Sequence, residues 1–281
     1  MRWIGALTAV LVVMPSAWAG AQTLDEIKNS GVLKVGYRED AAPYSYKNNI
    51  GEPDGYTVGL CKAVGSQIAS QVGIAELSIE YVPVTTEDRF QAVQDGKIDL
   101  LCGATTTTLG RRELIDFSLP TFVDGTGVLL REDSPKTFGE LAGHKVGVRA
   151  ATTTEEALDK TLEREKIEAT VVPVESHDEG LAKLEAGEVS AYFADQAILH
   201  FLLSKADAPD GMFLGDGQYT LEPYALALRR GDDDFRLAVD RALSRIYRSK
   251  EVDLIFKNSF GAKASKSELV QALYLINSLN E

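Results

Sequence analysis

Short apolar runs alternate with amphipathic segments along most of this chain, and this alternation constrains its fold more than any other feature. Apolar runs bounded by turn residues are typical of buried strands, whereas apolar residues at helical spacing are typical of helices that cover a sheet. Repetition of strand, helix and strand is the pattern of a mainly parallel sheet with helices on its faces. The sequence therefore predicts an α/β fold.

The alternation occurs in two series, which indicates two lobes. The first series predicts strands at 32–36, 77–82 and 97–102 and helices at 58–71 and 86–94. A Thr cap, with Glu87 and Asp88 in the first turn, is expected to open the second of these helices. The second series predicts strands at 145–148, 169–174 and 189–194 and helices at 153–165, 177–186 and 195–205. After a strand at 224–228 only helices are predicted, beginning with 232–248.

The first residues have the composition of a secretory signal peptide. Arg2 supplies a positive start, and residues 3–14 form an apolar run too short to span a membrane. Two overlapping cleavage patterns follow, Ala17-Trp18-Ala19 and Ala19-Gly20-Ala21, so cleavage is expected after residue 19 or 21. A buried N-terminal helix is the alternative. No cysteine lies near these positions, so no lipid anchor is expected.

Length and charge limit the classes of partner. Removal of the leader leaves about 260 residues, which fits two modest lobes better than one core. Loss of Arg2 changes the net charge from −13 to −14. This acidic balance argues against nucleic acid and anionic membranes as partners. An acidic ligand would need a locally positive pocket, so clustered arginines become candidate binding residues.

Cys61 and Cys102 are the only cysteines. In an oxidising compartment an even pair favours a disulfide, and two separate buried thiols are the alternative. Two cysteines and three scattered histidines lack the spacing of a metal site, so no metal is expected.

The segment from Ile98 to Arg112 carries the strongest functional signal. A predicted buried strand runs into the turn Gly103-Ala104-Thr105-Thr106, and Arg111 stands five residues after Thr106. Ligands of open α/β sheets bind at strand ends. Free backbone N–H groups, hydroxyls and a guanidinium suit a carboxylate that is bound bidentately. The alternative is a solvated helix start with a surface arginine.

Several further motifs, taken in order, make the sequence resemble the polar amino-acid binding proteins of ABC transporters (solute-binding protein family 3). They cover nearly the whole mature chain: GVLKVGYR (31–38), PYSY (43–46), GY (55–56), GKID (96–99), DFS (116–118), ATTT (151–154), LEAG (184–187) and YFAD (192–195). The resemblance implies the type II periplasmic binding protein fold, with two α/β lobes joined by a two-crossing hinge.

The same resemblance implies the division of the chain. Residues 1–21 would be the signal peptide, and residues 125–222 would form lobe 2. Lobe 1 would be discontinuous, comprising 22–124 and 223–281, because the helical tail returns to it. The hinge crossings would lie near 121–126 and 222–224.

Roles for the common amino-acid group of a ligand follow from the resemblance. Arg111 would clamp the α-carboxylate, helped by Thr106. Thr152 and Thr153, at a helix N-terminus of lobe 2, would contact the ligand across the cleft, and helix N-termini favour anions. Asp195 would accept hydrogen bonds from the α-ammonium group. The alternative for Asp195 is a helix cap.

Within the family the best match is to glutamate/aspartate-binding proteins, which use two further arginines and a histidine around the distal carboxylate. Arg38, Arg89 and His177 stand at the matching places. Two guanidiniums would pair a carboxylate that is costly to bury alone, whereas glutamine would leave their charges uncompensated. The alternative is that both arginines are surface residues paired with acids such as Glu39 or Asp88, and that His177 caps a helix.

Two positions depart from the family pattern. Ala104 stands where the glutamate/aspartate group commonly has Ser, which removes one side-chain hydrogen bond. Arg149 stands where a smaller or uncharged residue is more frequent, so an additional positive charge can reach the cleft. Tyr44 and Tyr46 are candidates for apolar walls around the ligand, with core packing as the alternative.

Taken together, the resemblance implies a monomeric periplasmic protein that captures an L-amino acid by hinge closure and delivers it to the membrane permease of an ABC transporter. Glutamate/aspartate is the favoured ligand; glutamine, another polar amino acid or an opine is the alternative. No catalysis and no cofactor are expected. The rivals are an enzyme similar to periplasmic cyclohexadienyl dehydratases, with Asp195 at the place of a catalytic Glu, and a membrane-fused sensor module.

Overall fold

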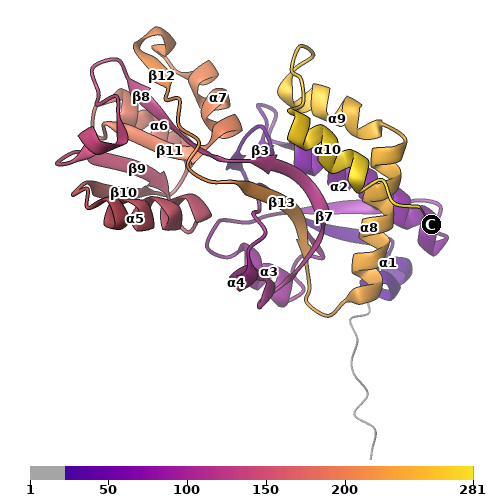
Figure 1. The fold of residues 1–281 in the computed structure, drawn as a ribbon. Coiled ribbons are helices and arrows are strands. Elements are labelled where there is room, and N and C mark those ends of the chain that lie inside the picture. Colours follow the sequence, from indigo (N-terminus) through magenta and orange to yellow (C-terminus); the bar gives the residue numbers. More distant parts are fainter. Residues whose placement is uncertain (1–22, 281) are drawn as a thin grey trace, which may run out of the picture.

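A computed structural model describes residues 23–280, so the predicted leader and both tryptophans, Trp3 and Trp18, lie outside the described residues. Two five-stranded sheets form the centres of two lobes (Figure 1). A three-stranded sheet adds to the first lobe and consists of β2 (Asp40–Ala41), β3 (Ser45–Lys47) and β4 (Pro53–Asp54). The predicted α/β class is confirmed.

The first sheet has the order β5–β1–β6–β13–β7. Its strands are β5 (Ser78–Pro83), β1 (Val32–Tyr37), β6 (Leu100–Cys102), β13 (Glu222–Leu228) and β7 (Asp116–Asp124). β1 is parallel to both of its neighbours, whereas β13 is antiparallel to β6 and β7. The carboxyl ends of β1 and β6 therefore meet at one edge of the sheet, which is where open α/β sheets bind ligands.

The second sheet has the order β10–β9–β11–β8–β12. Its strands are β10 (Thr170–Val174), β9 (Lys145–Arg149), β11 (Ala191–Asp195), β8 (Thr126–Arg131) and β12 (Met212–Leu214). β9 is parallel to β10 and β11, and β8 is antiparallel to β11 and β12. The carboxyl ends of β9 and β11 again meet at one edge.

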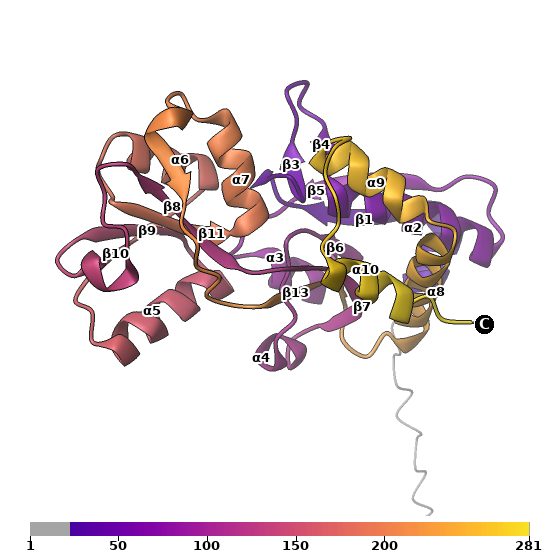
Figure 2. The same cartoon turned by 45° about the horizontal axis from the view of Figure 1, so that its top comes forward.

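Helices cover both sheets. Those of the first lobe are α1 (Thr23–Ser30), α2 (Tyr56–Val72), α3 (Arg89–Gln94), α4 (Leu109–Arg112), α8 (Asp233–Arg248), α9 (Glu251–Phe260) and α10 (Glu268–Ile276). Those of the second lobe are α5 (Thr153–Glu165), α6 (His177–Glu185) and α7 (Gln196–Lys205), with short 3₁₀ turns at Phe138–Leu141 and Pro209–Gly211. The C-terminal helices pack on α2 and β7, so the tail lies against the first sheet (Figures 1 and 2).

Apolar side chains fill the layers between sheets and helices. In the first lobe Leu33 and Leu100 are fully buried beneath α2, and in the second lobe Val146 and Phe193 are buried beneath α5. Burial of each such side chain contributes about 1.5–3 kcal/mol to folding. Apolar cores therefore lie within both lobes, and the core that contains Leu33 and Leu100 continues from the first lobe into the second.

Two adjacent chain segments connect the lobes. β7 ends at Asp124 and β8 begins at Thr126, while the returning chain enters β13 at Glu222, which pairs with Asp124. Both views show β7 and β13 running side by side between the lobes (Figures 1 and 2). A Cβ at Gly125 would lie 2.5 Å from the carbonyl oxygen of Thr220, so the close approach of the crossings requires glycine here.

Several predicted boundaries are wrong by a few residues. α3 begins at Arg89 rather than at residue 86, because the Thr86 hydroxyl donates to Glu87 (2.8 Å) instead of capping the helix. Asp88 Oδ1 accepts from the backbone N–H of Thr85 (2.7 Å), which holds residues 85–88 in a turn. β6 begins at Leu100 rather than at 97, because the backbone N–H groups of 97 and 98 bond to Ala92 at the end of α3. β11 begins at residue 191, two residues after the start that was predicted for it at residue 189.

Candidate functional site

A small pocket lies between the two lobes and is lined by residues of both. The first lobe contributes Arg38, Arg89, Ala104, Thr106 and Arg111, and the second contributes Arg149, Thr152, Thr153, Thr154, His177, Phe193, Ala194, Asp195 and Ile198. The free space between these side chains is about 20 Å³, so the two lobes are closely apposed around the pocket. The structure thus brings all of the predicted ligand residues to one pocket except Gly103.

Gly103 approaches the Arg38 side chain and does not line the pocket. A Cβ at this position would stand 3.3 Å from Cγ of Arg38, which is a tight contact. The residue therefore leaves room for the Arg38 side chain and is not among the residues that line the pocket.

Strand ends and helix starts position the lining residues, as the fold predicts. Arg38 follows β1, Ala104 and Thr106 follow β6, and Asp195 ends β11. Thr153 is the first residue of α5 and His177 the first of α6. The pocket is consequently built at the carboxyl edges of both parallel sheet portions.

Arg111 is held from two directions in the first lobe. Its backbone N–H donates to Thr108 Oγ1 (3.1 Å), which caps α4, and its Nη1 donates to the carbonyl oxygen of Thr106 (2.8 Å). Cζ of Arg111 lies 5.2 Å from the ring centre of Phe90, and Cζ of Arg89 lies 4.7 Å from the same ring. The ring face attracts both guanidiniums and helps to fix their positions.

Arg89 is buried and only partly hydrogen-bonded. Its Nη2 donates to the carbonyl oxygen of Ala151 in the second lobe (3.2 Å), whereas Nε and Nη1 are buried with no hydrogen-bond partner among residues 23–280. Burial, followed by the positive charges of Arg38 and Arg111, lowers the pKa of Arg89. Buried N–H groups of a charged side chain are costly to leave unpaired, so this guanidinium is suited to an anion in the pocket.

Arg38 and Arg149, in contrast, already have carboxylate partners. Nε of Arg38 donates to Oδ1 of Asp40 (2.8 Å) and Nε of Arg149 donates to Oδ2 of the same residue (3.2 Å). Nη1 of Arg149 also donates to Oε1 of Glu87 (3.0 Å). Although burial raises it, the charge of Arg38 and then those of His177 and Arg149 lower the pKa of Asp40 to about 2.

Two of the alternative interpretations are wrong. Arg38 and Arg89 are not surface residues, since their side chains are 3% and 2% exposed, and Arg38 pairs with Asp40 rather than with Glu39. His177 does not cap α6, because Ser176 Oγ accepts from the backbone N–H of Glu179 (3.1 Å) in that role.

The charge balance of the pocket follows from these pairings. Asp40 and Glu87 compensate Arg38 and Arg149, whereas Arg89 and Arg111 form no ion pair within residues 23–280. The guanidiniums of Arg89 and Arg111 are therefore available to pair with two anionic groups of a ligand.

Asp195 offers a carboxyl group to the same pocket. It stands at the N-cap position of α7 but makes no side-chain cap; Asp124 Oδ2 accepts from the backbone N–H of Ala197 (3.2 Å) instead. Burial, and then the neighbouring Asp124 and Glu222, raise the pKa of Asp195 to about 8. A cation beside it would favour the ionised form.

Thr152 and Thr153 connect the second lobe to its surroundings. Thr152 caps α5 by accepting from the backbone N–H of Glu155 (3.1 Å). Thr153 donates to Oε2 of Glu222 (3.0 Å), and its hydroxyl lies 3.3 Å from that of Thr106 in the first lobe. The contact between Thr153 and Thr106 spans the cleft directly.

The tyrosines expected as pocket walls lie elsewhere. Tyr44 is fully buried in an aromatic cluster with Phe122, Tyr224 and Phe260, and its hydroxyl donates to Asp124 Oδ2 (2.6 Å). Tyr46 contacts Phe201 with 5.9 Å between ring centres. Neither lines the pocket, so the expectation of apolar walls was wrong.

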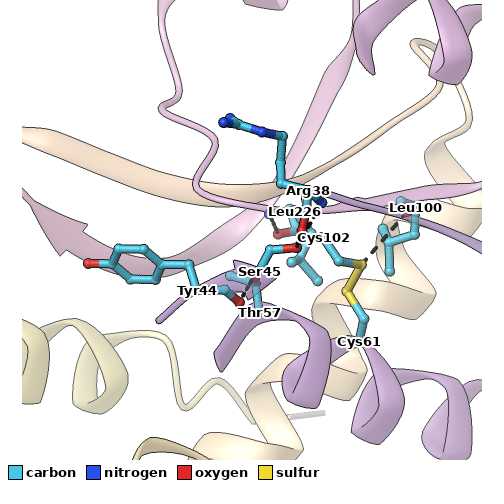
Figure 3. Close-up of a disulfide and its surroundings, with 9 residues drawn as sticks. Arg38, Tyr44, Ser45, Thr57, Cys61, Leu100, Cys102 and Leu226 are labelled. Atoms are coloured by element: carbon cyan, nitrogen blue, oxygen red, sulfur yellow. Dashed lines mark hydrogen bonds between the residues drawn. A yellow bond between two sulfur atoms is a disulfide. The ribbon is translucent and has the colours of Figure 1, made fainter. Parts of the chain in front are cut away.

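A disulfide joins Cys61 of α2 to Cys102 at the end of β6. Figure 3 shows it beside Arg38, whose guanidinium points away from the sulfur atoms. The backbone N–H of Arg38 donates to Ser45 Oγ (2.9 Å) in the same region. The bridge therefore ties the strand end that precedes Gly103 to the helix beneath the sheet.

Some residues of the site were not found from the sequence. Phe193 and Ala194 line the pocket beside Asp195, and Ile198 reaches it from the first turn of α7. The YFAD motif could have drawn attention to the first two. Asp40 was also missed: its pair with Arg38 is only two residues away in sequence, whereas its pair with Arg149 comes from the other lobe and has no local signal.

Comparisons with known proteins agree with this geometry. The family model of the bacterial extracellular solute-binding proteins, family 3, matches residues 33–262. The L-glutamate/L-aspartate-binding protein of Pseudomonas aeruginosa is 32% identical over 90% of this chain and 86% of its own length. The glutamate/aspartate import solute-binding protein of Escherichia coli K12 is 30% identical over 87% of this chain and 82% of its own length.

A solved structure shares the fold. The ancestral amino-acid-binding protein AncCDT-1, a precursor of cyclohexadienyl dehydratase, superposes with a TM-score of 0.73 at 28% identity and covers 85% of this chain and 99% of its own.

Proposed function

The chain belongs to the bacterial extracellular solute-binding proteins of family 3, and on that premise we propose that it captures glutamate or aspartate in the periplasm and delivers it to the permease of an ABC transporter. The observation that carries this proposal is the pair of guanidiniums, Arg89 and Arg111, that have no carboxylate partner in an otherwise compensated pocket. A dicarboxylic amino acid supplies one carboxylate for each.

The pose follows from the positions of the charged groups. The α-carboxylate pairs with Arg111 and with the hydroxyl of Thr106, and the α-ammonium pairs with Asp195. The distal carboxylate reaches Arg89 and the imidazole of His177. Each of these groups lines the pocket, and charge-assisted hydrogen bonds of this kind are about twice as strong as neutral ones.

Charge also supports an acidic ligand over glutamine. An amide at the distal position would leave the positive charge of Arg89 uncompensated in a buried site. Such a mismatch costs about 2–3 kcal/mol, which corresponds to a preference of roughly a hundredfold for the acid.

The mechanism is closure of two lobes around the solute. Contacts across the cleft, such as Arg89 Nη2 to the Ala151 carbonyl and the Thr106–Thr153 pair, exist only when the lobes are apposed. A ligand that touches both lobes shifts the equilibrium towards this form by its differential affinity. The adjacent crossings at Asp124 and Glu222 are the bending region of this proposal.

The direct test is calorimetric titration of the mature protein, unfolded and refolded beforehand to remove carried-over ligand. We expect tight binding of L-glutamate or L-aspartate and binding of L-glutamine that is about a hundredfold weaker. A preference for glutamine, or silence with both acids, would contradict the acidic ligand while leaving the family membership unchanged.

A second candidate function rests on one observation. The raised pKa of Asp195 places a protonated carboxyl in the pocket, which is a property of general acids, and AncCDT-1 is a precursor of a dehydratase. We favour binding without catalysis because the chain's relatives are solute-binding proteins. Incubation with prephenate decides between them, since turnover would establish the enzyme.

The carboxyl of Asp195 makes the affinity depend on pH. The ligand ammonium requires the ionised carboxylate, whereas the pKa of about 8 keeps the group protonated below that pH. Binding therefore releases a proton at pH 6–7, and the association constant should rise by up to about tenfold per pH unit until pH 8. Calorimetry in two buffers of different ionisation enthalpy measures the proton count. Asp195→Asn should bind weakly with no pH slope; an unchanged slope would exclude Asp195 as the source.

Arg149 stabilises the closed form in this proposal, because its ion pairs to Asp40 and Glu87 cross the cleft. We expect Arg149→Met to weaken glutamate and glutamine equally, by about tenfold, and to increase the radius of gyration of the ligand-free protein in X-ray scattering. Arg164→Met removes an exposed arginine of α5 and serves as the control. A loss confined to glutamate would instead make Arg149 a direct ligand contact.

A further inference from the structure

One buried hydroxyl beside the pocket is unused by the function proposed above. Tyr192 of β11 is fully buried, and its hydroxyl oxygen lies 2.8 Å from Nδ1 of His177. Tyr192 itself does not line the pocket, whereas His177 does. The tyrosine therefore acts on a ligand only through the imidazole.

Close packing fixes the Tyr192 ring. A Cβ at Gly180 of α6 would stand 2.1 Å from Cε2 of the tyrosine, and a Cβ at Gly147 of β9 would stand 3.0 Å from Cδ2. Two glycines thus make the space that the ring occupies between strand and helix. The ring planes of His177 and Tyr192 are nearly perpendicular, at 81°.

The number of protons on the imidazole determines which group donates in the hydrogen bond between Tyr192 and His177. Burial, and then the positive charges of Arg38 and Arg149, lower the pKa of His177 to about 4 despite the opposing charges of Asp40 and Asp178. The imidazole is therefore neutral at pH 7 and carries one proton. Within residues 23–280 the Tyr192 hydroxyl has His177 Nδ1 as its single hydrogen-bond partner.

Only one arrangement leaves no buried donor unpaired. If Nδ1 carried the imidazole proton, the phenol proton of Tyr192 would be buried without an acceptor, at a cost of about 1–3 kcal/mol. If the phenol donates, Nδ1 accepts and the imidazole proton stays on Nε2. Nε2 has no hydrogen-bond partner within residues 23–280, but it is not among the buried atoms that lack one, and His177 lines the pocket, so water or a ligand there can accept its proton.

We propose that Tyr192 is a positioning residue that donates its hydroxyl proton to Nδ1 of His177 and thereby holds the imidazole as the Nε2-protonated tautomer, which presents an N–H donor to the distal carboxylate of the ligand. This assignment rests on the proposed function for its ligand, but its tautomer is a property of the ligand-free protein. A donor at this point selects distal groups that accept hydrogen bonds and rejects distal ammonium and guanidinium groups.

The test begins with ¹⁵N-labelled histidine in the ligand-free protein. The chain has three histidines, so ring resonances are assignable by single His→Gln substitutions. Long-range ¹H–¹⁵N correlation spectra distinguish the two tautomers directly. We expect His177 to show a protonated Nε2 and an unprotonated Nδ1 in the wild type, and a mixture of tautomers in Tyr192→Phe.

The Tyr192→Phe substitution keeps the ring and its packing, so the fold is expected to persist. Glutamate affinity should fall by about five- to tenfold, because the imidazole must then select its tautomer on binding. Tyr219→Phe, in the same lobe and outside the pocket, is the matched control and should change neither the spectrum nor the affinity.

A wild-type proton on Nδ1 overturns the proposal, whichever ligand the protein binds. An unchanged His177 tautomer in Tyr192→Phe overturns it as well, since the tyrosine would then have a structural role only. Failure of the proposed function would give a different result. The wild type would then bind no acidic amino acid, whereas the spectrum of the ligand-free protein would still identify the tautomer of His177.

Discussion

Replacement of Arg111 by alanine is expected to abolish the binding of every amino acid. This guanidinium is placed by Thr106 and Thr108 and has no ion-pair partner within residues 23–280, so the α-carboxylate common to all candidates is its partner. Removing one member of a buried charge pair costs about 3–5 kcal/mol, which is a loss of roughly a hundredfold to several-thousandfold in affinity. Calorimetry with glutamate, aspartate and glutamine measures the effect.

Arg112→Ala provides a matched control for that experiment. Arg112 is the next residue of α4, carries the same charge and is exposed. Its removal should leave all affinities within about twofold, as is usual for surface substitutions. If Arg111→Ala retained the affinity of any of the three amino acids, the carboxylate clamp would have to be placed elsewhere in the pocket.

Arg89→Met should change the preference of the protein rather than abolish binding. The substitution removes the charge opposite the distal carboxylate, so glutamate is expected to lose about a hundredfold. Glutamine should lose much less, because it forms no ion pair there. The contact to the Ala151 carbonyl is lost for both ligands alike, so the ratio of the two affinities is the quantity to compare.

The same variant should be more stable than the wild type without ligand. Two N–H groups of Arg89 are buried and unpaired, and burial lowers its pKa. The positive charge of Arg89 therefore destabilises the ligand-free protein. We expect thermal unfolding of ligand-free Arg89→Met a few degrees above the wild type. Equal affinity losses for glutamate and glutamine, together with a lower unfolding temperature, would make Arg89 a structural residue.

Periodicity predicted most elements because each has a buried face and a clear start. α5 begins at Thr153 and ends at Glu165 as expected, since Thr152 is a side-chain cap and the helix buries Leu158 and Leu162. The onset of α3 was misplaced because Asp88 accepts from the backbone N–H and the hydroxyl of Thr85, and the Thr86 hydroxyl donates to Glu87. Side-chain hydrogen bonds that compete with the helix in this way cannot be detected from the spacing of apolar residues.

The site was predictable as a set of residues but not as a charge balance. Motifs and resemblance brought Arg38, Arg89 and Arg111 together, and the structure places all three at the pocket. They did not indicate that Asp40 compensates Arg38, or that Glu87 reaches Arg149 from the other lobe. The first pair is two residues apart within one lobe, whereas the second depends on how the lobes meet, which no local spacing encodes.

The position of β13 has a consequence for the order in which the chain folds. This strand lies between β6 and β7, yet residues 125–221 separate it from β7 in sequence. The second sheet draws all of its strands from one continuous stretch ending at Leu214, so it is complete before β13 exists on a chain made from its N-terminus. Contacts distant in sequence also form slowly. We therefore expect the lobe that starts the sequence to be the last to acquire its structure.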